Sequence, residues 1–185
     1  MTGHTTKAIA AQGTKTDVAV TLERTVAKIA VQASTTAEFS ERYSGKVRIN
    51  SAVLSKAASR SNLIAQQTPN TGPMTFTHTQ AADELSGKFR NLFYVPENGE
   101  LAEGSRLLLT LGATYDRDGN FSTTDDQAEV TYPVELSGDG AGRFLRNGYY
   151  RVQALIDGLT GSELSVSISV ADWEAPVTQS VNLGQ

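Results

Sequence analysis

The segment from Arg143 to Trp173 constrains the fold most, because it alternates apolar and polar residues over two long runs. In the second run, aliphatic residues occupy every other position and serines stand between them. A period of two places these sets on opposite faces of a β-strand. The intervening Gly158-Leu159-Thr160-Gly161 is typical of a turn. The segment therefore predicts a hairpin with one face on a core and one face in water. The expected inward residues are Val152, Ile156, Val166 and Ile168, and the expected outward ones are Ser165, Ser167 and Ser169.

The same alternation recurs along the chain and predicts an all-β sandwich class. Its phase changes near Arg24-Thr25, which predicts a bulge or a move between sheets. Residues 32–45 read as a polar connection, residues 55–74 have loop composition, and a domain boundary is expected around Ser86-Gly87-Lys88. The apolar pair Leu63-Ile64 is expected to hold the long loop down. The strand segments are residues 17–31, 46–50, 74–79, 107–115, 130–136 and 177–183.

Composition excludes several classes of function. A net charge of −4 argues against a nucleic-acid surface, which needs clustered Lys and Arg. The sequence contains no cysteine, which removes thiolate chemistry, disulfides and Cys-based zinc sites. No apolar run approaches the ~20 residues of a membrane helix, and no signal-peptide pattern follows Met1. The 185 residues suffice for one large or two small domains.

An enzyme is disfavoured, because the sequence contains no Gly-x-Ser-x-Gly elbow, no phosphate loop and no pattern of a His-containing triad. Asp125-Asp126 falls in an expected loop and is read as solvated charge. Asp116, Asp118 and Asn120 are spaced like the start of a calcium loop, but Gly119 is out of place for it. A hairpin turn is the favoured interpretation of this loop, and a bound ion is the alternative. No catalytic residue, metal ligand or cofactor is assigned.

Three segments together resemble the Bacteroides-type fimbrillins, the FimA- and Mfa-like surface pilus subunits. The first is VTLERTVAKIAV, from Val20 to Val31, and the second is FYVPEN, from Phe93 to Asn98. The third joins LRN and YYRV, from Leu145 to Val152, to the serine-rich strand that ends in DWE. They stand in the family's order and bracket most of the chain. The positions that carry the resemblance are Arg24, Lys28, Pro96, Glu97, Asn98, Arg146, Asn147, Tyr150 and Trp173.

The resemblance implies two transthyretin-like β-sandwich domains in tandem. We expect an incomplete N-terminal domain over residues 1–87 and a C-terminal domain with the terminal strand over residues 88–185. The family segment before the first motif is longer than the one found here, so we expect a truncated start. The family's maturation arginine and lipidation cysteine are therefore not carried over. Arg24 invites interpretation as a cleavage site, but the alternation around it favours an arginine within a strand.

The resemblance also implies the function: a structural subunit of a cell-surface fimbrium that assembles by donor-strand exchange and supports adhesion. Its partners are other fimbrial subunits, in a homo- or heteropolymer, and it reaches the outer membrane only through a lipid anchor of the precursor. The alternative is an accessory or tip adhesin that binds host glycan or protein. Tyr94, Tyr149 and Trp173 could stack on sugars, although packing is the favoured role of each. The candidate donor-strand residues are Val177, Gln179, Val181 and Leu183.

Overall fold

The computed structural model describes residues 1–69, 72–85, 88–172 and 177–182. Within these ranges the chain forms eleven strands and one short helix. No helix among them is long and apolar enough to cross a membrane. The strands are β1 (Asp17–Leu22), β2 (Val26–Thr35), β3 (Lys46–Ala57), β4 (Phe76–Ala81), β5 (Glu84–Leu85), β6 (Lys88–Pro96), β7 (Leu108–Asp116), β8 (Gln127–Glu135), β9 (Gly148–Ile156), β10 (Leu164–Asp172) and β11 (Val177–Asn182), and the helix is α1 (Ala37–Arg42).

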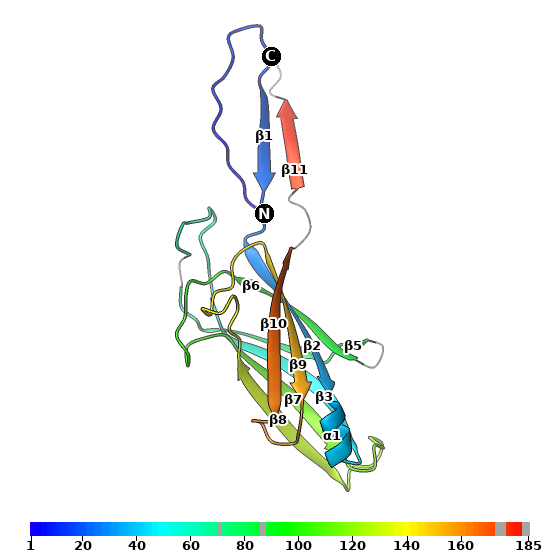
Figure 1. The fold of residues 1–185 in the computed structure, drawn as a ribbon. Coiled ribbons are helices and arrows are strands. Elements are labelled where there is room, and N and C mark those ends of the chain that lie inside the picture. Colours follow the sequence, from blue (N-terminus) through cyan, green and yellow to red (C-terminus); the bar gives the residue numbers. More distant parts are fainter. Residues whose placement is uncertain (70–71, 86–87, 173–176, 183–185) are drawn as a thin grey trace.

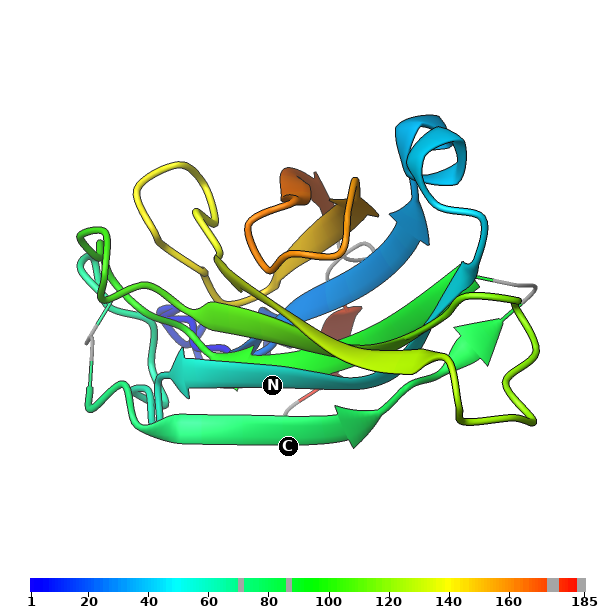
Figure 2. The ribbon, with the colours of Figure 1, turned by 90° about the horizontal axis from the view of Figure 1, so that it is seen from below.

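Nine of these strands form a two-layer sandwich (Figure 2). One sheet has five strands in the order β10-β9-β2-β6-β5, and the other has four in the order β4-β3-β7-β8. Aliphatic and aromatic side chains from both sheets fill the space between them, as the alternation requires. The all-β class is therefore confirmed. Fully buried members of this core include Ile29, Leu54, Phe93, Leu109, Tyr132 and Ile156.

Strand pairing crosses the boundary expected near residue 87. β2 pairs with β6 in antiparallel and with β9 in parallel orientation, and β3 pairs with β7. Strands from both halves of the sequence thus share both sheets. The division into residues 1–87 and 88–185 does not correspond to this arrangement, because the hydrogen-bond partners of β2 and β3 include strands that come after residue 87.

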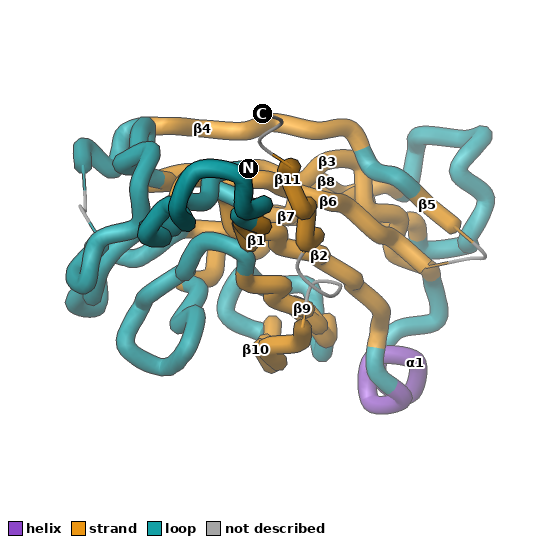
Figure 3. Tube along the Cα trace, turned by 90° about the horizontal axis from the view of Figure 1, so that it is seen from above, coloured by secondary structure: helices purple, strands orange, loops and turns teal. Residues whose placement is uncertain are grey.

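β1 and β11 pair with each other in a separate two-stranded sheet, here called the ribbon. Figure 1 shows the ribbon extending beyond one end of the sandwich, and Figure 3 looks down on it with the two layers beneath. The chain leaves the ribbon at Leu22 and enters the five-stranded sheet at Val26. The predicted phase change is thus a move between sheets. Arg24 lies between the two strands, so its assignment to the interior of a strand is wrong.

α1 was not expected, because residues 32–45 read as a polar connection. β2 continues to Thr35, and Thr36 then caps the helix by accepting a hydrogen bond from the backbone N–H of Phe39. Phe39 is buried in the sandwich core. A helix of six residues has too few turns to show a helical period, which explains why the sequence pattern missed it. It lies at the end of the sandwich away from the ribbon (Figure 1).

The hairpin predicted from Arg143 to Trp173 is confirmed as β9 and β10. Val152 faces Ile168 across the pair, and Ile156 faces Leu164. The serines of β10 are exposed, and Val152 and Ile156 are buried. However, β10 is an edge strand, so Val166 and Ile168 are only half-buried, and Val170 is 58% exposed. The phase of the strand was predicted correctly and the depth of its burial was not.

Two substitutions in β10 test this phase. Ile168→Ala should lower the free energy of unfolding by about 1–2 kcal/mol, because a half-buried side chain loses less than the 2–5 kcal/mol of a fully buried one. Ser167→Ala, at an exposed position, should stay within about 0.5 kcal/mol of the unchanged protein. Urea denaturation measures both values. Equal losses would contradict the assignment of the two faces.

Candidate functional site

The motif positions Glu97, Asn98, Arg146, Asn147 and Tyr150 come together at the ribbon end of the sandwich, and are here called the motif cluster. β6 ends at Pro96 opposite Val26, where β2 begins. β9 runs parallel to β2 and begins at the same end. The segment after β6 and the segment before β9 therefore meet there, and the backbone N–H of Asn98 donates a hydrogen bond to the carbonyl oxygen of Phe144.

Arg146 and Glu97 form a buried ion pair, with side chains 6% and 5% exposed. The guanidinium also donates hydrogen bonds to the carbonyl oxygens of Asn62, at 2.6 Å, and Leu63, at 3.1 Å. The hydrogen bond with Glu97 raises the pKa of Arg146, and burial opposes this only in part. Arg146 thus fastens the loop between β3 and β4 to both motif segments.

The amide groups of the motif cluster fix its backbone. Asn98 is fully buried, and its Nδ2 donates hydrogen bonds to the carbonyl oxygens of Gly99 and Gly142, both at 2.7 Å. Asn147 has a φ of 59°, a conformation that asparagine tolerates better than most residues, and its N–H donates to the carbonyl of Val26 at 3.0 Å. These contacts tie the start of β9 to the start of β2.

Tyr150 completes the motif cluster from within the core. Its ring centroid lies 4.6 Å from that of Phe144, and its hydroxyl accepts a hydrogen bond from the N–H of Leu145 at 2.8 Å. Burial raises the pKa of Tyr150, although the hydrogen bond from Leu145 acts in the opposite direction. The neutral phenol therefore serves as a fixed packing and hydrogen-bonding group at this end of the sandwich.

Three further motif positions, Lys28, Pro96 and Arg24, are not part of the motif cluster. Lys28 is on the outer face of β2, with its Nζ 4.4 Å from the ring centroid of Tyr149. Pro96 ends β6, and Arg24 lies between β1 and β2. Trp173 lies outside the described residues. The described motif positions therefore combine a buried structural cluster with one residue on the outer face of β2, one at the end of β6 and one between β1 and β2.

A cleft of about 570 Å³ lies beside the base of the ribbon. It is lined by the first residues of the chain, by residues 21–23 at the end of β1, and by residues 63–65 of the β3–β4 loop. Leu63 and Ile64 are 72% and 54% exposed, so the expectation that this pair holds the loop down is wrong. Arg146 holds the loop instead, through the backbone carbonyls of Asn62 and Leu63.

The candidate donor strand coincides with β11 and pairs with β1 over six residues. Val181 lies opposite Val18, Gln179 opposite Val20, and Val177 opposite Leu22. Leu183, the fourth candidate, lies outside the described residues. This pairing places the terminal strand in the ribbon and outside the sandwich core.

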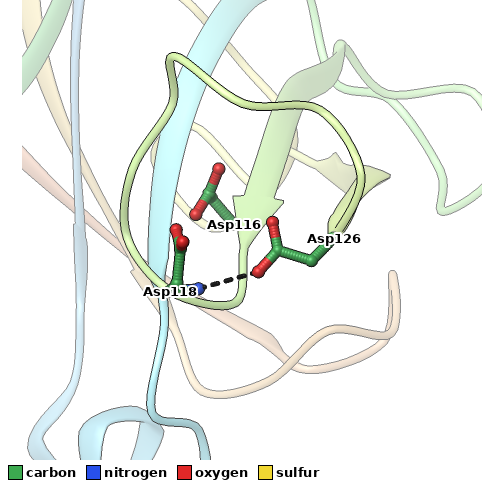
Figure 4. A group of neighbouring side chains, drawn as sticks. All are labelled: Asp116, Asp118 and Asp126. Carbon is green, nitrogen blue, oxygen red and sulfur yellow. Dashed lines mark hydrogen bonds between the residues drawn. The ribbon is translucent and has the colours of Figure 1, made fainter.

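Asp116, Asp118 and Asp126 meet in the loop between β7 and β8, with ligand oxygens within 4.8 Å of one another (Figure 4). Antiparallel pairing of β7 with β8 confirms the predicted hairpin. The carboxylates accept hydrogen bonds within the loop, from Asn120 and Gln127 to Asp116 and from the Asp118 N–H to Asp126. Such oxygen atoms could hold a hard cation such as Ca²⁺, and they also close the hairpin.

The pKa values of Asp116 and Asp118 are shifted in opposite directions. Burial disfavours the charged form of Asp116, but hydrogen bonds led by that of Gln127 outweigh it and lower its pKa. The hydrogen bond from Asn120 favours ionised Asp118, yet its neighbour Asp116, burial and Asp126 together raise the pKa of Asp118. The hydrogen bonds of the loop thus favour ionisation of Asp116 over ionisation of Asp118.

Comparison with known proteins shows that this chain shares its fold with several solved structures. No family model matches the chain, and no curated protein matches it in sequence. A "putative cell adhesion protein" from Parabacteroides distasonis ATCC 8503 has a TM-score of 0.57 and 14% identity over 82% of this chain and 52% of its own. A second "putative cell adhesion protein", from Bacteroides eggerthii DSM 20697, has a TM-score of 0.54 and 16% identity over 83% of this chain and 57% of its own. A fimbrilin (fimA) from Porphyromonas gingivalis W83 has a TM-score of 0.51 and 17% identity, over 82% and 58%.

The chain therefore spans little more than half the length of these solved structures. At identities this low the likeness establishes the fold. It confirms, at that level, the fimbrillin resemblance that the three sequence segments carry.

Proposed function

We propose that this chain, which has the fold of a fimbrilin and of cell adhesion proteins, is a structural subunit of a cell-surface fimbrium. The observation that carries the proposal is the ribbon: a terminal strand pairs with one other strand, outside the sandwich core. A strand held in this way can be exchanged for the equivalent strand of another subunit without opening the core. The prediction of tandem transthyretin-like domains stays a prediction, because one sandwich accounts for nine of the described strands.

Assembly by donor-strand exchange uses the physics of β-augmentation, in which backbone hydrogen bonds give strength and alternate side chains fill pockets. An isolated two-stranded ribbon is marginally stable, which favours release of β11 from β1. Val177, Val181 and Leu183 supply the alternating apolar set, with Gln179 between them. Burial of each apolar side chain in a neighbouring subunit would contribute roughly 1.5–3 kcal/mol before ordering costs.

The partners in this proposal are other fimbrial subunits, in a homo- or heteropolymer at the cell surface. Contact with the outer membrane is through a lipid anchor of the precursor alone. The role is structural and adhesive, without catalysis or a cofactor. The motif cluster supports it by fixing the end of the sandwich from which the ribbon emerges.

Deletion of residues 175–185 tests the role of the terminal strand. The melting temperature of the monomer should hardly change, because β11 pairs outside the sandwich. Filament formation by the full-length precursor after maturation should be abolished, as electron microscopy would show. Val181→Asp should have the same effect, since a buried carboxylate without a partner is costly. Ser180→Asp adds the same charge at the alternate position of β11 and should be tolerated better.

Two results would overturn this proposal. Filaments of normal length from the deleted protein would show that β11 is no donor strand. A large fall in the melting temperature of the deleted monomer would show that β11 completes the fold of its own subunit. Melting is measured on the monomer and assembly on the matured precursor, so the two outcomes can be told apart.

A further inference from the structure

The outer face of the five-stranded sheet concentrates positive charge on a protein that is negative overall. Alternation along β2 turns Ile29 and Val31 into the core and leaves Lys28 and Gln32 on the outer face. The same alternation places Arg90 of β6 and Arg151 of β9 on that face, where both are exposed. At the described outward positions of β6, β2, β9 and β10 there is no Asp or Glu. This surface is here called the basic face.

Register arranges the side chains of the basic face in rows across the strands. In one row Lys28 stands between Tyr149 of β9 and Tyr94 of β6. Two residues further along β2, Ala30 stands between Arg151 and Leu92. Because β6 and β9 flank β2, the outer strands of a row lie about 10 Å apart. Because the side chain of Ala30 is small, the surface is depressed there relative to the rows of Lys28 and Gln32 on either side.

The third row is polar throughout. Gln32 lies between Arg90 of β6 and Gln153 of β9, and Ser167 of β10 continues the row beyond Gln153. A cleft of about 400 Å³ runs over these rows, and its lining includes Ala30, Gln32, Arg90, Arg151, Gln153 and Ser167. The basic face is therefore hollowed along the low middle row and bordered by cationic, amide and hydroxyl groups.

Aromatic rings border the same surface. Tyr94 is 47% exposed, and Tyr149 is half-buried beneath two cations. Lys28 Nζ lies 4.4 Å and Arg151 Cζ 5.1 Å from the Tyr149 ring centroid. These contacts hold both cations over the sheet, which lowers the entropy that they lose when they bind a ligand.

We propose that the basic face binds an acidic polysaccharide. Arg90 and Arg151 offer charge-assisted hydrogen bonds to sulfate or carboxylate groups. Gln32 and Gln153 can pair with sugar hydroxyls through both donor and acceptor atoms, and Ser167 can do the same. The inference rests on the adhesive role proposed above, but it concerns the monomer and does not require assembly.

The chemistry of the basic face favours a glycan over other polyanions. Nucleic-acid surfaces cluster more Lys and Arg than the three cations whose side chains are described on this face, on a chain whose net charge is −4. The amides and hydroxyls have no special match to a phosphate backbone, whereas a polysaccharide presents hydroxyls along its whole length. An acidic protein would offer fewer hydroxyl groups to the same row.

The test measures binding of the monomeric chain to heparin, hyaluronan and neutral dextran by isothermal titration calorimetry. Heparin carries sulfates and hyaluronan only carboxylates, so the two probes distinguish the acidic group, and binding to either supports the proposal. Arg90→Gln with Arg151→Gln should weaken binding by about tenfold or more, because two charge-assisted contacts are lost. Arg60→Gln with Arg117→Gln removes the same charge from exposed loop positions and should leave the affinity nearly unchanged.

Further probes separate the glycan from other polyanions. Gln153→Ala should weaken heparin binding and leave binding of polyglutamate and of thymidine homopolymer unchanged. The proposal is overturned if the Arg90/Arg151 variant binds like the unchanged protein, or if the Arg60/Arg117 variant loses as much affinity. It is also overturned if dextran, polyglutamate or the thymidine homopolymer binds as tightly as the acidic glycans. Filament assembly of the Arg90/Arg151 variant, scored separately, should stay normal, so a failure of this inference is distinct from a failure of the proposed function.

Discussion

Glu97→Ala should lower the free energy of unfolding by about 3–5 kcal/mol, because it leaves the Arg146 guanidinium buried without its partner charge. Both side chains are almost completely inaccessible to water. The two remaining hydrogen bonds of Arg146, to the carbonyls of Asn62 and Leu63, carry no negative charge to replace the carboxylate. Chemical denaturation of the monomer measures the loss.

Two control variants separate the cost of leaving a buried charge unpaired from the cost of merely shortening a side chain. Glu97→Leu combined with Arg146→Met should recover most of the lost stability, since apolar groups of similar volume can replace a buried pair at little cost. Arg143→Ala removes a partner of Asp139 in a pair whose arginine side chain is 45% exposed, and should cost about 1 kcal/mol or less. If Glu97→Ala lowered the free energy of unfolding no more than Arg143→Ala, the buried Glu97–Arg146 pair would contribute no more than an exposed one.

Ile29→Ala and Leu109→Ala should each lower the free energy of unfolding by about 2–5 kcal/mol and shift the same transition. Ile29 lies in β2 and Leu109 in β7, on opposite sides of residue 87, and both are fully buried in one core. A single core of this size unfolds cooperatively. Differential scanning calorimetry should therefore show one transition, moved down by either substitution.

The matched control is Val170→Ala, in the exposed part of β10, which should change the melting temperature little. Two transitions, of which Ile29→Ala moved one and Leu109→Ala the other, would contradict a shared core. They would instead support a division of the chain near residue 87.

Local pattern determined most of the strands, but it predicted neither β5 nor β6 and ended β3 at residue 50, whereas β3 continues to Ala57. A period of two in residues 164–170 defined which side chains of β10 face the core, and the turn residues from Gly158 to Gly161 defined its hairpin with β9. The phase change near Arg24 marked the passage from the ribbon to the sandwich. These features could be predicted because each depends on residues close together in the sequence.

Distant pairing was decided only by the tertiary structure. β2 pairs in parallel with β9, although Ile29 and its partner Tyr150 are far apart in the chain. No local sequence pattern indicates which distant strand will pair with β2. The pairing depends on which strands together bury the core side chains. For the same reason the sequence could not show that β10 lies at an edge, where Val170 is exposed, or that strands on both sides of residue 87 share two sheets.

The candidate sites also divide into features that local sequence indicates and features that only the tertiary structure shows. The sequence identified Glu97, Asn98, Arg146 and Asn147 as motif positions, but their ion pair and hydrogen bonds exist only because β6 and β9 both flank β2. The sequence did not identify Arg90 as a binding residue, since a single arginine in a strand does not indicate a binding site. It joins Lys28 and Arg151 on one face because register aligns three strands that are distant in the chain. Residue spacing thus determined the local elements, and long-range hydrogen bonding and burial decided which of their side chains meet.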